Sequence, residues 1–108
     1  MFVLTSECNF EMLRNPATEM FTPKGIMIDC NHANSGKDPE RQELVFNNLM
    51  LQIKDGDESI IGTMIESNIN AGNQSISKDM EYGVSVTDAC LDWDNTKRIL
   101  LNAHDSLK

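Results

Sequence analysis

Three side chains of the kinds that bind divalent metal ions occupy comparable places in the sequence. His32 follows a short strand-like run, Glu66 ends a second apolar run, and Asp88 follows a long polar stretch. One imidazole and two carboxylates form a donor set that suits Mn²⁺, Fe²⁺, Co²⁺ or Zn²⁺. We therefore take His32, Glu66 and Asp88 as candidate ligands of one metal ion.

Each of these residues also has a plainer interpretation, which composition alone leaves open. His32 would then be a hydrogen-bonded loop histidine, Glu66 a solvated charge at the rim of a sheet, and Asp88 a residue at the start of a helix. Asn34 and Ser35, just after His32, either satisfy backbone groups of a turn or contact a substrate. The elements that carry these residues therefore matter for the choice.

The two apolar runs, residues 26–29 and 60–66, are predicted to be neighbouring parallel strands of one β-α-β unit. Between them, residues 40–54 place apolar side chains at three-to-four spacing, which predicts a helix with one buried face. His32 and Glu66 lie 34 positions apart, about the length of such a unit. Parallel strands bring their carboxyl ends to the same edge of a sheet, about 4.8 Å apart. The topology thus predicts that His32 and Glu66 face one point beyond that edge.

The rest of the chain is interpreted as support for this edge. Residues 1–4 predict a short strand, and residues 60–66 are apolar enough for a strand covered on both faces. Residues 68–83 predict a polar loop of a length that is often functional. In that loop, Gly72-Asn73-Gln74 is either a tight turn or a place where backbone approaches a ligand. Trp93 is predicted to be a packing anchor at the entry of a final helix.

The bulk composition excludes several classes of protein. The chain has 108 residues, 40% apolar and 24% charged, which is typical of one soluble globular domain or a piece of one. Its net charge of −8 and scattered basic residues argue against nucleic acid as a partner. No apolar run approaches the ~20 residues of a membrane span, and residues 1–10 lack the features of a signal peptide, so we expect a cytoplasmic protein. Three cysteines without a paired motif predict small buried hydrophobes.

Four blocks of sequence, in order and at matching spacing, resemble the class I, microbial aromatic-pathway 3-deoxy-D-arabino-heptulosonate 7-phosphate (DAHP) synthases. The blocks are residues 27–35 (MIDCNHANS), 62–68 (GTMIESN), 71–74 (AGNQ) and 82–93, which begins YGVSVTDAC and ends at Trp93. The resemblance is to the C-terminal third of that family. It divides the chain into a poorly matching N-terminal segment, 1–24, and a DAHP-synthase-like part, 25–108.

The resemblance implies an α/β fold, the last two to three βα units of a (β/α)₈ TIM barrel. Residues 26–29 would be barrel strand seven, 60–65 strand eight, and 96–107 part of the last helix. It also implies a transferase that condenses phosphoenolpyruvate with erythrose 4-phosphate, the first step of aromatic amino-acid biosynthesis.

His32, Glu66 and Asp88 fall on three of the four metal ligands of that family, at the catalytic face of the barrel. The ion would polarise the aldehyde oxygen of the sugar phosphate as a Lewis acid. His32 would additionally act as a catalytic residue that orients or protonates the centre derived from phosphoenolpyruvate.

Parts of the family pattern are missing from this chain. The fourth ligand of the family is a cysteine near the second strand, which Cys30 does not match, and the phosphate-binding Lys-Pro-Arg motif also lies outside the resemblance. Where the family has Leu-Arg-Gly-Gly, Leu4 is followed by Thr5 and Ser6. We therefore expect a fragment that is inactive alone.

Three functional hypotheses follow from these gaps. The first is a piece of the synthase that works once self-association or a complementing chain supplies the remaining strands. The second is a non-catalytic, degenerate paralogue or interaction module that keeps part of the metal site. The third is a stand-alone α/β protein that binds a divalent metal ion.

Overall fold

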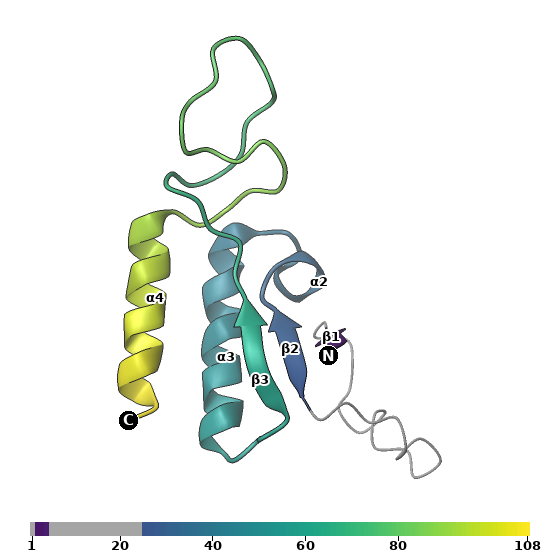
Figure 1. The fold of residues 1–108 in the computed structure, drawn as a ribbon, viewed down its shortest axis with the longest axis vertical. Helices are drawn as coiled ribbons and strands as arrows, with labels where there is room; N and C mark the ends of the chain where they lie inside the picture. The colour runs from purple at the N-terminus through teal and green to yellow at the C-terminus, as the bar shows by residue number, and fades with distance from the viewer. Residues whose placement is uncertain (1, 5–24) are drawn as a thin grey trace.

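The computed structural model describes residues 2–4 and 25–108, and it contains a three-stranded parallel sheet (Figure 1). The strands are β1 (Phe2–Leu4), β2 (Ile26–Asp29) and β3 (Ile60–Met64), and β2 lies in the middle. Ile26 pairs with Ile60, and after an irregularity in register Met27 pairs with Gly62. The three predicted strands are thus confirmed. Apart from β1, the predicted segment 1–24 lies outside the described residues, as does Cys8.

The two long helices follow the predicted pattern with small shifts at their ends, whereas the short helix α2 lies where a turn was predicted. They are α2 (His32–Ser35), the 3₁₀ helix η2 (Pro39–Arg41), α3 (Gln42–Lys54) and α4 (Trp93–Ser106). Asp38 caps η2 by accepting from the Glu40 backbone N–H at 3.0 Å, so the first turn is 3₁₀ and α3 starts after it. Asp92 caps α4 by accepting from the Asn95 N–H at 2.8 Å. No helix in the described part of the chain is both long and apolar enough to cross a bilayer.

An apolar core lies between the sheet and the two long helices. Figure 1 shows α4 running beside α3. The buried members of the core are Ile26, Ile28, Cys30, Phe46, Leu49, Ile60, Leu91, Ile99 and Ala103. Phe46 and Leu49 come from the predicted apolar face of α3. The prediction for Trp93 was wrong: its side chain is 58% exposed, because it sits in the first turn of α4, outside this core.

The face of β3 opposite the core is open. Ile60 points into the core, whereas Ile61 is 62% exposed and Met64 is partly exposed. Within the described residues β3 pairs only with β2, so one of its edges carries no neighbour. Among the described residues the expectation of a strand covered on both faces is therefore wrong, because Ile61 and Met64 of β3 are exposed. The open edge is a place where a further strand would pair, and the open face is one that a further element would cover.

The long excursion between β3 and α4 leaves and returns at the carboxyl end of the sheet (Figure 1). Its two limbs are joined by backbone hydrogen bonds, from Leu91 N–H to Glu66 O (3.0 Å) and between Gly72 and Cys90 in both directions (2.9 and 3.1 Å). Gly72 has a φ of +85°, a conformation that favours glycine. The Gln74 side chain binds the backbone of Glu81 at both its N–H and its carbonyl. These bonds give the polar loop a defined path, which returns Asp88 to the end of β3.

Candidate metal centre

The three candidate ligands come together at the carboxyl edge of the sheet. His32 follows β2, Glu66 follows β3, and Asp88 lies on the returning limb of the excursion. The His32 Nε2 atom lies 3.2 Å from Asp88 Oδ2 and 3.5 Å from Glu66 Oε1. One ligand atom of each residue lies within 4.8 Å of the other two. The side chains are partly exposed, so an ion or a substrate can reach them from solvent.

A compact network after β2 fixes the position of His32. Asp29 Oδ1 accepts from the Asn31 backbone N–H (2.8 Å), and Asp29 Oδ2 lies 2.7 Å from His32 Nδ1. The Asn34 side chain donates to the Asp29 carbonyl at 2.6 Å. Within this turn His32 takes a φ of +50°, which is uncommon for a residue other than glycine and costs about 1 kcal/mol or more. Such a conformation persists where the surroundings enforce it, and here it turns the imidazole toward Glu66 and Asp88.

The electrostatics of the cluster favour a cation. The hydrogen bond from Asp29 raises the pKa of His32 most, the charge of Asp29 adds to this, and Glu66 and Asp88 contribute further, while desolvation opposes them. Every charged group that acts on His32 in this way is a carboxylate. Three acceptor atoms therefore surround one point, and their mutual repulsion is relieved by a proton or by a metal ion. Imidazole nitrogen and carboxylate oxygen are the donors expected for such an ion.

Glu66 is held by a residue that the sequence did not bring out as functional. Gln42, fully buried at the start of α3, donates from Nε2 to the Glu66 carbonyl (3.1 Å) and accepts the Glu66 N–H at Oε1 (2.8 Å). The sequence feature that could have identified Gln42 is its position: it is a polar residue four positions before Phe46, on the apolar face of α3. Asp29 was missed for a similar reason: it is a buried carboxylate at the end of an apolar strand.

The remaining site candidates lie close to this network. Ser35 is fully buried and donates to Asn31 Oδ1 at 2.8 Å, while Asn34 binds the Asp29 carbonyl as described. A contact of Asn34 or Ser35 with substrate stays a prediction. Cys30 points into the core with its Sγ 2.9 Å from Thr63 Oγ1, and burial raises the pKa of its thiol. Cys30 and Cys90 are both buried and free, as predicted for small hydrophobes.

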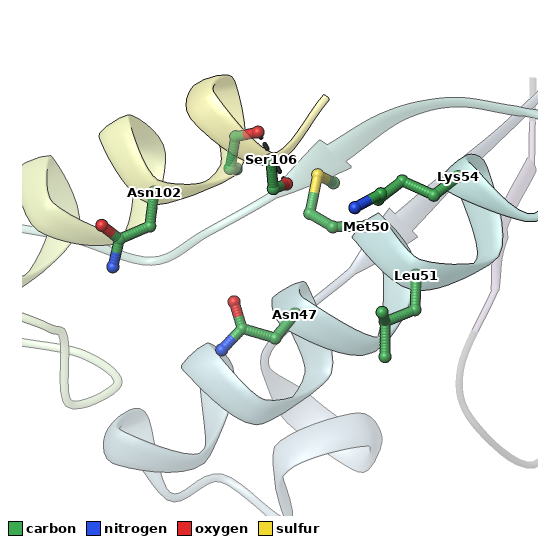
Figure 2. Close-up of a pocket in the computed structure, with 7 residues that line it drawn as sticks. Asn47, Met50, Leu51, Lys54, Asn102 and Ser106 are labelled. Carbon is green, nitrogen blue, oxygen red and sulfur yellow. Dashed lines mark hydrogen bonds between the residues drawn. The ribbon is translucent and has the colours of Figure 1, made fainter. Parts of the chain in front are cut away.

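Two surface hollows lie apart from the ligand atoms. One, of about 400 Å³, is lined by Ser67, Asn68, Ile69 and Trp93. The other, of about 280 Å³, lies between α3 and α4 and is lined by Asn47, Met50, Leu51, Lys54, Asn102, Ala103 and Ser106. Figure 2 shows the second hollow, where the Ser106 hydroxyl donates back to the Ala103 carbonyl of its own helix (2.9 Å). Neither hollow contains a candidate ligand.

Comparison with known proteins identifies one group of relatives. The sequence model of the DAHP synthetase I family matches residues 9–101. A Tyr-sensitive phospho-2-dehydro-3-deoxyheptonate aldolase of Enterobacter agglomerans is 47% identical over 109 residues, covering 95% of this chain and 47% of the relative. The Tyr-sensitive enzyme of Escherichia coli is 53% identical over 85 residues, covering 76% of this chain and 24% of the relative.

A solved structure agrees with these relatives. The phospho-2-dehydro-3-deoxyheptonate aldolase of Francisella tularensis superposes with a TM-score of 0.71 at 43% identity, over 76% of this chain and 24% of that one. The chain thus spans between a quarter and a half of the length of the relatives compared here.

Proposed function

This chain belongs to the DAHP synthetase I family, and we propose that it is the part of a DAHP synthase that carries three of its metal ligands. The full reaction would join phosphoenolpyruvate to erythrose 4-phosphate. The observation that supports this most directly is the convergence of His32, Glu66 and Asp88 on one point. We place β2 and β3 as the last two strands of the (β/α)₈ barrel, with the open edge of β3 facing the next strand of the closed sheet.

The residues of this chain would hold the ion and shape its surroundings. His32 Nε2 and one oxygen each of Glu66 and Asp88 would bind it, and Mn²⁺, Fe²⁺, Co²⁺ and Zn²⁺ all accept such donors. A divalent ion in this place acts as a Lewis acid toward a carbonyl oxygen. The imidazole of His32 is also exposed enough to contact a substrate next to the ion.

The phosphate groups of the substrates require residues from outside this chain. The charges that act on His32 are carboxylates, and the chain carries nine basic against seventeen acidic residues. Phosphate recognition in proteins depends on Arg, Lys and backbone N–H groups. We therefore propose that activity appears when a complementing segment, supplied by another chain or as a continuation of this one, closes the barrel and brings the cationic residues.

A complementation assay tests this proposal. The 108-residue chain is mixed with the separately expressed remainder of the E. coli relative, and consumption of phosphoenolpyruvate is followed in the presence of Mn²⁺ and erythrose 4-phosphate. We expect turnover from the mixture and none from either part alone. His32→Ala and Glu66→Ala should reduce it to background, because each removes one ligand, whereas His104→Ala, on the exposed side of α4, should leave it unchanged. A mixture that stays active with His32→Ala would overturn the proposed site.

A second candidate function is a non-catalytic module that keeps part of the metal site. It is favoured by the acidic surroundings of His32, which bind a cation without binding phosphate. Such a module would bind Mn²⁺ in a calorimetric titration. In the complementation assay it would give no turnover with any complementing segment.

A further inference from the structure

We propose that Asp29 is a positioning residue that holds the neutral imidazole of His32 in one tautomer, with the proton on Nδ1 and the lone pair on Nε2. The inference rests on the proposed metal centre only for its consequence, which is that the lone pair is free for an ion between Glu66 and Asp88. Its structural basis is independent of any ion and lies in the network that follows β2.

Both oxygens of the Asp29 carboxylate have partners. The carboxylate is buried, Oδ1 accepts the backbone N–H of Asn31 at 2.8 Å, and Oδ2 lies 2.7 Å from His32 Nδ1. A carboxylate only accepts, so the short contact is a hydrogen bond when Nδ1 carries the proton. A neutral imidazole has one proton on its two nitrogens, and Nε2 is then the acceptor.

The opposite side of the ring shows where that lone pair points. Nε2 lies 3.2 Å from Asp88 Oδ2 and 3.5 Å from Glu66 Oε1. With a lone pair on Nε2, these three atoms are all acceptors and have no hydrogen atom to share. A proton or a metal ion placed between them makes the arrangement favourable, and the tautomer set by Asp29 leaves the Nε2 lone pair free for that purpose. Partners of this kind orient ligating histidines and change metal affinity by about 10- to 100-fold.

The substitution Asp29→Asn gives a sharp test because the network dictates how the amide must sit. The Asn31 N–H needs an acceptor, so the amide oxygen takes the place of Oδ1 and the NH₂ group takes the place of Oδ2. The NH₂ group is a donor and faces Nδ1, which must then accept. The imidazole proton moves to Nε2, where it blocks the ligand position. The side chain keeps its volume and its bond to Asn31, so a purely structural role of Asp29 would be largely preserved.

The tautomer can be read directly by nitrogen NMR of the ¹⁵N-histidine-labelled chain, which contains only two histidines. The metal-free chain is measured as the pH is raised until the His32 signals stop changing, because its imidazole is then neutral. His104, on the exposed side of α4, serves as an internal reference in the same spectrum. We expect a protonated Nδ1 and an unprotonated Nε2 for His32, the reverse in Asp29→Asn, and a mixture in Asp29→Ala.

Calorimetric titration with Mn²⁺ alone then measures the consequence. We expect Asp29→Asn to weaken Mn²⁺ binding about 10- to 100-fold. Asp29→Ala should weaken it less, because alanine removes the preference for the tautomer with the proton on Nδ1 without favouring the opposite tautomer. Asp105→Asn is the matched control: its carboxylate lies on the exposed surface of α4, paired with Lys108 at 2.9 Å, and binding should not change.

The outcomes separate this inference from the proposed function. A proton on Nε2 of His32 in the unsubstituted chain overturns the inference, even if Asp29→Asn fails to fold. The same holds if a folded Asp29→Asn chain keeps the original tautomer or the original Mn²⁺ affinity. If the tautomer behaves as expected but the unsubstituted chain takes up no Mn²⁺, the positioning role of Asp29 stands and the proposed metal centre falls.

Discussion

At the scale of single residues, a proton and the metal ion of the proposed function would compete for the same place in the cluster. His32 is flanked by Asp29 on one ring nitrogen and by Glu66 and Asp88 on the other. Without metal, these carboxylates stabilise the protonated imidazole and raise its pKa, with the hydrogen bond to Asp29 as the main cause. Metal binding requires the neutral imidazole. Binding of the proton should therefore weaken as the pH rises, whereas binding of the metal ion should strengthen.

The first prediction concerns the metal-free chain. Because the pKa of His32 is higher in the folded than in the unfolded state, its contribution to stability is fully present below the ordinary histidine pKa of about 6.5. That contribution is lost as the pH rises through the folded-state pKa. We expect the free energy of unfolding, measured with urea in the presence of a chelator, to fall over this range. His32→Gln should flatten the dependence, and a pH profile identical to that of the unsubstituted chain would contradict the assignment.

The second prediction concerns the stabilisation of the chain by added Mn²⁺, whose pH dependence should have the opposite sign. An ion that binds the folded chain stabilises it in proportion to the logarithm of its concentration relative to the dissociation constant. Since the proton must leave Nε2 first, this stabilisation should grow as the pH rises. Urea titrations at fixed excess Mn²⁺ should therefore give a free energy of unfolding that exceeds the metal-free value by an amount that grows with pH. This difference should disappear in Glu66→Ala. A difference that is independent of pH would mean that the ion binds elsewhere.

At the scale of elements, the site depends on how α3 is joined to the end of β3. The buried Gln42 bonds both the N–H and the carbonyl of Glu66, which links the first turn of the helix to the carboxyl edge of the sheet. A second link lies nearby, where Arg98 of α4 makes a two-pronged ion pair with Glu43 of α3 at 2.6 and 2.8 Å. The side chains of that pair are partly exposed, so it contributes little compared with the buried amide.

The third prediction tests the buried link. Gln42→Leu keeps the size of the side chain but removes its partners for two backbone groups, which should destabilise the chain by about 1–3 kcal/mol. It should also weaken Mn²⁺ binding, because Glu66 loses the contact that fixes its backbone. Gln52→Leu is the control on the same helix, since the Gln52 side chain is exposed to solvent more than that of Gln42 and donates to the Asn48 side chain, one turn away. If both substitutions cost the same in urea unfolding, Gln42 has no special role.

Some features of these elements could be predicted from the sequence, and others could not. Hydrophobic periodicity predicted the strands and the two long helices closely, because this signal is local. The parallel arrangement of β2 and β3 followed from the helix between them and predicted that His32 and Glu66 would meet. The roles of Asp29 and Gln42 were not visible, because a buried polar residue is recognised only by its partners, and those are distant in sequence or depend on turn geometry.

At the scale of the whole molecule, the sheet is open where a barrel would be closed. Ile61 on β3 is 62% exposed, and within the described residues the outer edge of β3 has no neighbour. An unpaired edge and an apolar face together favour association with another strand. The proposed function assigns this surface to the segment that completes the barrel. Without that segment, other copies of the chain compete for the same surface.

The last prediction follows from this competition. In sedimentation velocity the chain alone should form concentration-dependent assemblies, and Ile61→Lys should shift it toward monomer by charging the open face. Leu51→Lys provides the comparison, because Leu51 is exposed to a similar extent (60%) but lies on α3, at the hollow shown in Figure 2. We expect little effect from it. If the complementing segment uses the same surface, Ile61→Lys should also lower the turnover of the mixture while leaving Mn²⁺ binding to His32, Glu66 and Asp88 intact. Association that is abolished by Leu51→Lys and not by Ile61→Lys would place the interface on the helices and remove the main physical argument for closure of a barrel at β3.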